Sequence, residues 1–273
     1  MKVIIVGGVA GGATAATRIR RLDESAEIVI YEKSSYMACG TCGLPYFIGG
    51  VVEDIDNLLP QSPESFWQRY RVNVKLRHEV LAINSEKKLV TLINLNNNEI
   101  FTDSYDKLLL APGSKPVSAN LFNSKINGLF QLHNIEDGLR IRDFIANNEP
   151  KTAVIVGGGY IGIEMAENLT QLGIKVTIIQ QTDQLMNTLD YDMAALLLHG
   201  IRQKGVEVML NTTVNSIEPY GNSINLYLEN QASVAADMVI MAIGVAIPFS
   251  PFGAYIGLVP LPLSYFPWLI GIL

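Results

Sequence analysis

One pattern occurs twice in the chain and constrains its fold more than any other feature: an apolar run, a glycine-rich turn and a helical stretch. In the first copy, the segment 3–6 leads into the turn GGVAGG at 7–12 and an alanine-rich stretch. In the second copy, the segment 152–156 leads into GGGYIG at 157–162 and a stretch that ends at Leu172. Strand, glycine turn and helix in this order begin a parallel βαβ unit. We therefore expect an α/β chain with two Rossmann-like dinucleotide-binding domains.

The spacing of the glycines indicates what the turns bind. Glycine lets the backbone N–H groups at a helix N-terminus approach a pyrophosphate, whose charge the helix dipole favours. The second turn has glycine at all three positions of the GxGxxG pattern, Gly157, Gly159 and Gly162. The first turn keeps the outer two glycines but has Val9 in the middle. Both turns are predicted to bind a dinucleotide, the alternative for each being a merely tight turn.

A second strand follows each helix at the spacing of a βαβ unit, at 27–31 and 175–179. Glu32 ends the first of these strands, where a carboxylate accepts hydrogen bonds from a ribose; the alternative is an ordinary surface acid. Gln180 holds the corresponding position of the second unit. It is neither the acid that favours NAD nor the arginine that binds a 2′-phosphate, so the choice between NADH and NADPH stays open.

Further elements are predicted around these two units. Ser62 before Pro63 is typical of a helix N-terminus, asparagine-rich turns divide 72–101 into short strands, and 105–110 is predicted to be a buried strand. Helical periodicity covers 190–204, and strands are expected at 206–209, 214–217, 224–228 and 238–243. The predicted domains are 1–113 and 114–244, followed by a tail at 245–273.

Composition excludes several classes of function. With 20 Lys+Arg against 26 Asp+Glu, the net charge of -6 leaves no basic surface for nucleic acid. The three histidines are scattered and have no metal-ligand spacing with the cysteines, so we expect no metal. The only cysteines, Cys39 and Cys42, are too few for a secreted disulfide framework. They indicate a reducing compartment, the cytoplasm, and a chemical role.

The segment CGLPY, which begins at Cys42, follows the first βαβ unit and carries a resemblance. Together with GGVAGG at 7–12, APGSKP at 111–116 and the stretch from Gly157 to Glu164, it resembles the FAD-dependent pyridine nucleotide-disulfide oxidoreductases. The match extends over residues 1 to about 244 and is to their single-cysteine branch. That branch contains coenzyme A-disulfide reductases, persulfide reductases, NADH oxidases and peroxidases. Val9 is typical of the coenzyme A-disulfide members.

The resemblance implies both cofactors and a reaction. FAD is expected in the first domain and NAD(P)H in the second, with electrons passing from the nicotinamide through the flavin to Cys42. The implied substrate is coenzyme A disulfide or a related disulfide or persulfide. Two alternatives remain: an NADH oxidase or peroxidase that uses a sulfenic acid of Cys42, and a truncated, inactive remnant that only binds nucleotide.

The resemblance also assigns individual residues. Those assigned to FAD are Gly7, Gly8, Ala10, Gly11, Gly12, Glu32, Lys33, Val80, Ala111 and Gly113. Those assigned to NAD(P)H are Gly157, Gly159, Tyr160, Ile161, Gly162, Glu164, Gln180 and Gly244. In the family the acid matched by Glu164 lies beside the nicotinamide, and the aromatic matched by Tyr160 covers the flavin. Thr14, Arg18 and Arg21 match positions that contact coenzyme A, and paired arginines suit phosphates; the alternative is a solvated basic helix face.

Three residues near the redox cysteine depart from the coenzyme A-disulfide pattern. Ala38 and Thr41 replace a serine and an asparagine, which puts the thiol substrate in question. Cys39 forms a CxxC pair with Cys42, and this pair could cycle as an internal disulfide. The interpretation favoured by the sequence is that Cys39 is a small apolar filler.

The end of the sequence does not fit the family. After Asp237 there is no Asp, Glu, Lys or Arg, and prolines recur. Family members continue with a second FAD-contacting segment and a C-terminal dimerisation domain, which makes them homodimers. We therefore expect a truncated or frameshifted product that retains FAD weakly and dissolves poorly. A membrane anchor is not expected, because prolines and glycines interrupt the apolar tail.

Overall fold

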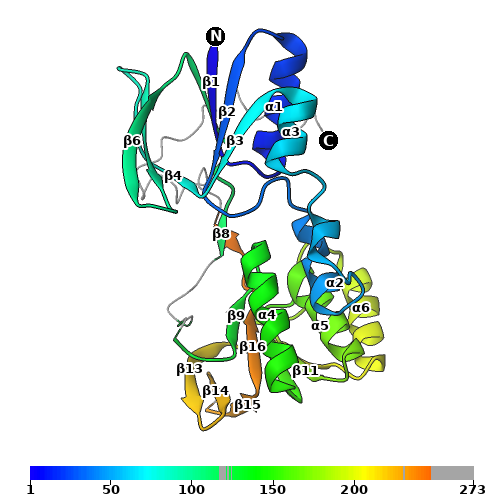
Figure 1. The fold of residues 1–273 in the computed structure, drawn as a ribbon. Helices are drawn as coiled ribbons and strands as arrows, with labels where there is room; N and C mark the ends of the chain where they lie inside the picture. Colours follow the sequence, from blue (N-terminus) through cyan, green and yellow to red (C-terminus); the bar gives the residue numbers. More distant parts are fainter. Residues whose placement is uncertain (117–120, 122, 124, 230, 247–273) are drawn as a thin grey trace. The chain divides into compact units, whose positions relative to one another are not determined.

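The computed structural model describes residues 1–116, 121, 123, 125–229 and 231–246. The chain forms two compact units, Met1–Pro112 and Gly113–Leu273, and Figure 1 follows its course through each of them. Each unit has its own parallel sheet, as the repeated strand-turn-helix pattern predicts. The expectations for the tail concern residues that, apart from Val245 and Ala246, lie outside the described part.

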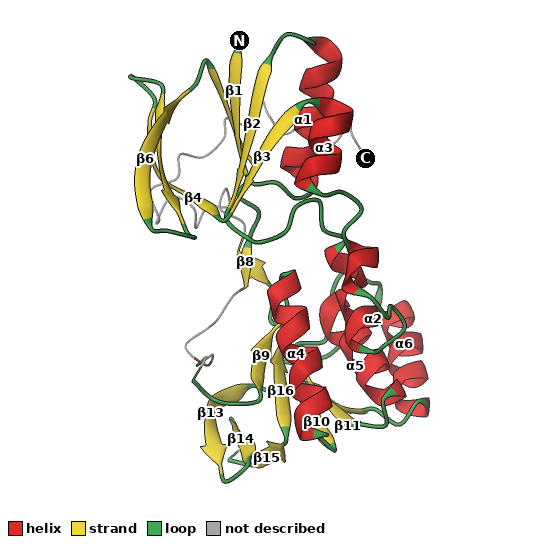
Figure 2. Ribbon diagram, viewed as in Figure 1, coloured by secondary structure: helices red, strands yellow, loops and turns green. Residues whose placement is uncertain are grey.

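The sheet of the first unit has four parallel strands in the order β3-β2-β1-β7. The helices α1 and α3 lie side by side on one face of it (Figures 1 and 2). On that face Val3 and Ile5 pack with Phe66 of α3 in one buried cluster. The elements are β1 Lys2–Val6, α1 Ala10–Leu22, β2 Glu27–Glu32, α3 Pro63–Tyr70, β3 Val72–Leu76 and β7 Lys107–Leu110.

A three-stranded antiparallel sheet covers the other face of the parallel sheet. Ile4 packs there with Val90 and Leu92, so that successive residues of β1 are buried on opposite sides. The strands are β4 His78–Asn84, β5 Leu89–Asn94 and β6 Glu99–Ser104. Between β2 and α3 the chain forms the 3-10 helix η1 Thr41–Gly43, the helix α2 Leu44–Ile48 and the 3-10 helix η2 Ile55–Leu58.

The prediction of a buried strand at 105–110 is wrong in part. The strand β7 begins at Lys107, its leucines Leu108 and Leu109 are half-buried, and Leu110 is 40% exposed. The reason is its position, because among the described residues β7 lies at the edge of the sheet and pairs only with β1.

The second unit repeats the plan with five parallel strands in the order β12-β11-β10-β16-β9. Val154 and Val239 of the sheet pack with Leu226 of a three-stranded antiparallel sheet in one buried cluster. The strands and helices are β9 Leu129–Gln131, α4 Ile135–Asn148, β10 Thr152–Val156, α5 Tyr160–Gln171, β11 Lys175–Ile179, α6 Tyr191–Gln203, β12 Glu207–Met209, β13 Val214–Tyr220, β14 Ser223–Leu228, β15 Ser233–Ala236 and β16 Met238–Met241. Two short strands, β8 Lys115–Pro116 and β17 Val245–Ala246, pair antiparallel.

The strands of this unit test the predicted boundaries. The expected bounds of β10 and β11 are confirmed residue for residue, whereas β16 ends two residues before the predicted Ile243. The helix α4 and the strand β9 were not predicted. A capping box marks the start of α4, since the Asn134 side chain accepts from the Asp137 N–H and the Asp137 side chain accepts from the Asn134 N–H. This pair is visible in the sequence and signals the helix.

An aspartate fixes the start of the central strand in each unit. In the first unit, Asp106 accepts a hydrogen bond from the Lys2 N–H at 2.6 Å and donates its own N–H to the Lys2 carbonyl at 2.9 Å. In the second, Asp237 accepts from the Thr152 N–H at 2.9 Å and donates to the Thr152 carbonyl at 3.2 Å. Asp106 directly precedes β7 and Asp237 directly precedes β16, the strands beside β1 and β10. The two anchors are therefore equivalent.

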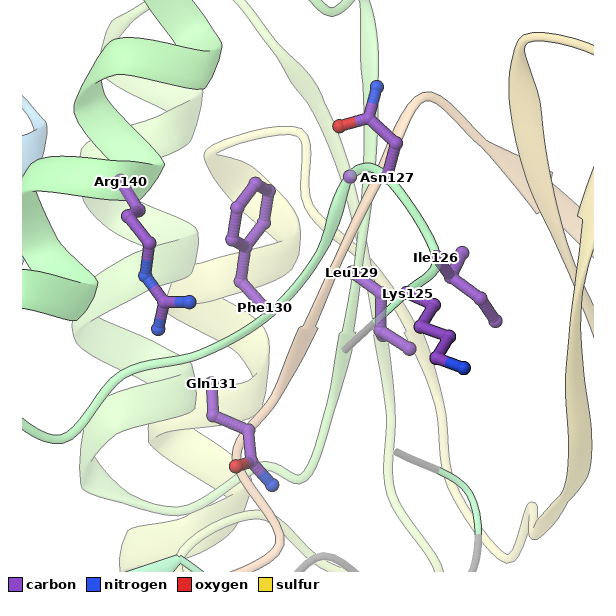
Figure 3. Close-up of a pocket in the computed structure, with 8 residues that line it drawn as sticks. Lys125, Ile126, Asn127, Leu129, Phe130, Gln131 and Arg140 are labelled. Atoms are coloured by element: carbon purple, nitrogen blue, oxygen red, sulfur yellow. The ribbon is translucent and has the colours of Figure 1, made fainter. Parts of the chain in front are cut away.

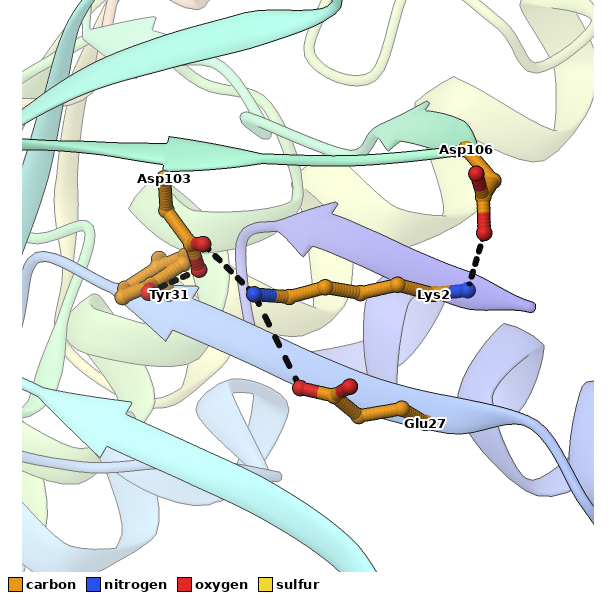
Figure 4. A network of polar contacts seen from close by, with 5 residues as sticks. All are labelled: Lys2, Glu27, Tyr31, Asp103 and Asp106. Carbon is orange, nitrogen blue, oxygen red and sulfur yellow. Dashed lines mark hydrogen bonds and ion pairs between the residues drawn. The ribbon is translucent and has the colours of Figure 1, made fainter.

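Ion pairs and hydrogen bonds around these anchors lower the pKa of two carboxyls. Figure 4 shows Asp103, which accepts from Lys2 Nζ at 2.5 Å and from the Tyr31 hydroxyl at 2.8 Å. Burial raises the pKa of Asp103, but these hydrogen bonds outweigh burial and hold it below its ordinary value. Burial likewise opposes the hydrogen bonds from Lys151 and Thr152 to Asp237, and the pKa of Asp237 is also lowered. Both carboxyls are thus stabilised in their charged form.

Candidate functional site

The first glycine turn connects β1 to α1 and needs glycine at its two ends. Gly7 has a φ of +97°, and a Cβ on it would lie 2.0 Å from the carbonyl oxygen of Ala111. A Cβ on Gly12 would lie 1.8 Å from the carbonyl oxygen of Gly7. Both contacts involve backbone atoms, which cannot rotate away as a side chain can. These two glycines are therefore required by the turn itself.

Val9, the departure from the GxGxxG pattern, lies at a position that does not need the positive φ favouring glycine. It is the N-cap of α1 and has a φ of -88°, a value open to any residue. Its counterpart Gly159 has a φ of -84°, and a Cβ built on it would meet nothing within 4 Å. Neither turn therefore needs a positive φ at its middle position, and at Gly159 there is space for a Cβ.

Glu32 links the end of β2 to the first turn. The side chain is buried, its Oε2 accepts the Gly8 N–H at 2.6 Å, and its Oε1 accepts the Ser34 N–H at 2.8 Å. It is thus not an ordinary surface acid. A buried carboxylate with two N–H donors is strongly oriented, and its remaining lone pairs can accept from ribose hydroxyls.

The second turn repeats this arrangement between β10 and α5. Gly157 has a φ of +111°, and its Cβ would lie 2.3 Å from the Ala242 carbonyl oxygen; a Cβ on Gly162 would lie 2.0 Å from the Gly157 carbonyl oxygen. Gln180 Oε1 accepts the Gly158 N–H at 2.7 Å, as Glu32 does with Gly8. Its Nε2 donates to the Thr182 hydroxyl at 2.6 Å. A neutral amide therefore makes the hydrogen bond that a carboxylate makes in the first unit.

Both turns leave donors for an anion. Ala10, Gly11 and Gly12 open α1, and Tyr160, Ile161 and Gly162 open α5. Their N–H groups have no acceptor in the part of the chain that the structure describes. With the positive end of a helix dipole behind them, such groups fit a pyrophosphate, so the residues present suit a dinucleotide in each unit.

The cysteine segment is attached to the first turn. Ala38 has a left-handed φ of 49°, and its N–H donates to the Gly8 carbonyl at 2.9 Å. Cys42 lies in η1, directly before α2, and its side chain is exposed. Cys39 is half-buried and its thiol donates to the Met37 carbonyl at 3.6 Å. The exposed thiol is therefore Cys42, on a loop that follows β2 at its carboxyl end.

The three residues assigned to coenzyme A share the exposed face of α1. Thr14, Arg18 and Arg21 are exposed, at the i, i+4 and i+7 positions of one helix face. Arg20, between them, is committed elsewhere, because its guanidinium donates to the carbonyls of Tyr70 and Arg71 at 2.8 and 3.0 Å. The side chains of Arg18 and Arg21 form no hydrogen bond or ion pair within the described residues. They are available for an anionic ligand.

The remaining assigned residues lie in varied surroundings. Lys33 forms an ion pair with Glu79 at 2.7 Å, and half-buried Val80 packs against the second core cluster of its unit. Tyr160 is 63% exposed at the start of α5. Burial, with the charge of Glu167, raises the pKa of Glu164 on the same helix. Gly113 and Gly244 both have positive φ, of +72° and +112°.

Ser34 and Thr182 are site residues that the sequence interpretation missed. Each follows the strand-end Glu32 or Gln180 by two positions: the Ser34 backbone N–H donates to Glu32 Oε1, and the Thr182 hydroxyl accepts from Gln180 Nε2. The signal was the shared offset of two residues from the strand end, since the Ser34 hydroxyl itself donates to the Tyr36 carbonyl.

Other features of the structure lie away from these turns. A pocket of about 230 Å³ beside β9 is lined by residues 125–131 and Arg140 (Figure 3), and contains no residue assigned to either nucleotide. Among the described residues, no group of three or more His, Cys, Asp or Glu side chains is placed to hold a metal ion. The same residues contain no helix long and apolar enough to cross a membrane.

Comparison with known proteins agrees with this geometry. The family model of the pyridine nucleotide-disulphide oxidoreductases matches residues 1–250. A coenzyme A disulfide reductase of Staphylococcus aureus strain NCTC 8325 is 40% identical over 243 residues, which are 89% of this chain and 54% of the relative. The chain thus spans about half the length of the curated relatives that it matches.

Two solved structures extend the comparison. The NAD-dependent persulfide reductase from A. fulgidus has a TM-score of 0.87 and 32% identity, covering 95% of this chain and 48% of the other. The water-forming NADH oxidase from Lactobacillus brevis, bound to NADH, has a TM-score of 0.87 and 28% identity, covering 96% and 57%.

Proposed function

Because the chain belongs to the pyridine nucleotide-disulphide oxidoreductase family, we propose that it passes electrons from NAD(P)H through FAD to Cys42 and reduces a small disulfide. The observation that carries the proposal is the exposed Cys42 thiol, on a segment whose Ala38 N–H is hydrogen-bonded to the Gly8 carbonyl of the first turn. That turn has the anchors of a dinucleotide site, with Glu32 for the ribose and the α1 N–H groups for the pyrophosphate. An exposed thiol thus lies four residues after Ala38, which is hydrogen-bonded to the proposed nucleotide site.

Each unit is proposed to bind one nucleotide, FAD in the first and NAD(P)H in the second. Bound FAD would supply the two-electron relay between a nicotinamide and a thiol. In the first unit Glu32 would orient a ribose, and Gly7 and Gly12, which close the turn against backbone carbonyls, would hold the α1 N–H groups toward the phosphates. In the second, Gly157 and Gly162 do the same for the nicotinamide nucleotide. Glu164, whose pKa burial raises, lies on α5, the helix that follows the second turn.

The step at the cysteine is a thiol-disulfide exchange. The Cys42 thiolate attacks one sulfur of R–S–S–R, forming Cys42–S–S–R and releasing R–S⁻. Two electrons then reduce this mixed disulfide to the Cys42 thiolate and a second R–S⁻, which take up protons according to pH. The exposure of Cys42 suits a substrate that arrives from solution.

We assign the substrate to the coenzyme A type, as disulfide or persulfide. Arg18 and Arg21 lie on one exposed face of α1 and have no ion-pair partner among the described residues, and Thr14 lies on the same face. Guanidinium groups bind phosphates in bidentate fashion, and coenzyme A carries three phosphates. A reducing compartment, the cytoplasm, would maintain the Cys42 thiol.

A second candidate is an NADH oxidase or peroxidase. The structural likeness to the Lactobacillus brevis oxidase favours it, and an exposed cysteine can form a sulfenic acid with peroxide. In that case the Cys42 sulfenic acid would be reduced to the thiolate by two electrons, with release of water. Ala38 and Thr41 depart from the coenzyme A-disulfide pattern, and these departures are compatible with the second candidate.

The test begins with a visible spectrum of the purified full chain, before and after anaerobic NADH or NADPH. Flavin bands that bleach support electron transfer, whereas their absence even after incubation with FAD would reduce the chain to a nucleotide-binding remnant. NAD(P)H consumption that depends on coenzyme A disulfide supports the reductase. Consumption that depends on oxygen or peroxide supports the second candidate.

Cysteine variants then identify the reacting thiol. Cys42→Ser should lower turnover with either oxidant by a factor of about 1000 or more, because no thiolate remains to attack. Unchanged turnover would refute the assignment of Cys42. Cys39→Ser should retain most of the activity, since we take Cys39 as a half-buried filler; a loss equal to that of Cys42→Ser would instead establish a CxxC disulfide.

A further inference from the structure

The two strand-end side chains differ by one charge, and this difference bears on the nicotinamide nucleotide. Glu32 and Gln180 accept the same backbone hydrogen bond, at 2.6 and 2.7 Å. A carboxylate at this position binds ribose hydroxyls and repels a 2′-phosphate. Gln180 keeps the hydrogen bond to the turn and removes the repulsion.

The orientation of the Gln180 amide is fixed from both ends. Its Oε1 is held by the Gly158 N–H, which leaves Nε2 to donate to the Thr182 hydroxyl. Thr182 in turn contacts the Gln184 carbonyl at 3.1 Å and Asn187 Oδ1 at 2.9 Å. The surroundings of the strand end are therefore neutral donors and acceptors.

No charge in the adjoining segment replaces the missing carboxylate or acts as a phosphate clamp. Residues 180–190 contain no Lys or Arg, and their acids are Asp183 and Asp190, both exposed. A 2′-phosphate would thus meet neither the arginine that selects NADP nor the buried acid that excludes it.

We propose that Gln180 is the specificity-determining residue of the second unit and that, being neutral, it lets this unit bind NADH and NADPH with similar affinity. The inference rests on the proposed function for the identity of the ligand. It predicts a property of this chain that neither turn geometry nor the cysteine chemistry determines.

The test is calorimetric titration of the full chain with NAD⁺ and with NADP⁺. The two dissociation constants of the wild type should lie within a factor of ten of each other. Gln180→Glu should weaken NADP⁺ binding at least tenfold relative to NAD⁺, because like charges a few ångströms apart repel strongly at a protein surface. The variant should fold, since the Thr182 hydroxyl can turn to donate to the new carboxylate.

Gln171→Glu is the matched control. It introduces the same charge at the exposed far end of α5, eleven residues or about 16 Å along the helix from Tyr160, and should leave the ratio of the two constants unchanged. A wild-type ratio of the two dissociation constants above ten would overturn the inference. So would a shift of that ratio by less than tenfold in Gln180→Glu, if circular dichroism shows that the variant is folded. If the variant is unfolded, the wild-type ratio alone decides.

This measurement separates the inference from the proposed function. Binding of both nucleotides without any disulfide reduction would leave the inference standing and refute the function. Disulfide reduction supported by only one of the two nucleotides would support the proposed function and refute the inference.

Discussion

The two glycine turns have nearly the same backbone and differ in the side chains that a ligand would meet. Both have outer glycines pressed against backbone carbonyls, and both donate one backbone N–H, of Gly8 or Gly158, to a strand-end side chain. They differ in Val9 against Gly159 and in Glu32 against Gln180. The shared features are those that the turn needs in order to fold. The features that differ are free to serve the bound nucleotide.

The largest expected effect tests the shared part. Gly12→Ala and Gly162→Ala each place a Cβ within 2.0 Å of a backbone carbonyl oxygen, so the helix must move off its strand. We expect each substitution to lower the free energy of unfolding by about 3 kcal/mol or more. Urea unfolding followed by circular dichroism measures this.

Gly11→Ala is the control for these two variants, because the nearest atom to its Cβ is a side-chain carbon 3.5 Å away. It should change the stability by less than about 1 kcal/mol. If Gly12→Ala were tolerated while Gly162→Ala was not, the two turns would not be equivalent, and the comparison would break.

A smaller effect is expected at the strand anchors, where the comparison extends to pH. The pKa of Asp237 is lowered in the folded state, so this carboxylate stabilises the fold fully above its ordinary pKa, and the contribution is lost as the pH falls through the lowered value. Asp237→Asn should cost about 1–2 kcal/mol near pH 7, since it weakens hydrogen bonds to a charged acceptor. The difference from wild type should shrink below about pH 4.

Asp103→Asn tests the low-pKa carboxyl of the first unit, which lies close to the anchor residue Lys2, because hydrogen bonds from Lys2 and Tyr31 lower the pKa of Asp103 against the effect of burial. Urea unfolding at a series of pH values compares both variants with wild type. A difference that stays constant from pH 7 to 3 would show that these carboxylates do not act through their charge.

The sequence predicted the shared plan well and the details of the edges poorly. Periodicity and glycine spacing gave both parallel sheets and the bounds of β10 and β11, because a strand buried on both faces is apolar throughout. The same reasoning made 105–110 a buried strand, whereas edge position leaves Leu110 40% exposed. Burial at an edge depends on which strands pair, and that information is not local.

The candidate site divides in the same way. Glu32 was predicted as a ribose acceptor, but its bonds to the Gly8 and Ser34 N–H groups follow from the juxtaposition of β2 with the turn. Nor does the sequence distinguish Arg18 and Arg21 from Arg20. Arg20 lies on the same helix, but its guanidinium donates hydrogen bonds to two backbone carbonyls at the C-terminal end of α3. Tertiary contacts decide which of three similar arginines is available.

The smallest expected effect concerns the middle position of the two turns. Val9 and Gly159 have φ values of -88° and -84°, so neither position needs the positive φ that favours glycine, and we expect each to accept the other's residue. Gly159→Val should change the free energy of unfolding by less than about 1 kcal/mol, because the lower flexibility of the unfolded chain offsets small losses. Val9→Gly should cost a similarly small amount. Calorimetric titration of Gly159→Val with NAD⁺ then isolates the role of the ligand. Weaker NAD⁺ binding by a folded variant would mean that glycine is needed there for the pyrophosphate. A loss of more than about 2 kcal/mol in the free energy of unfolding would instead mean that the two turns differ in their backbone requirements.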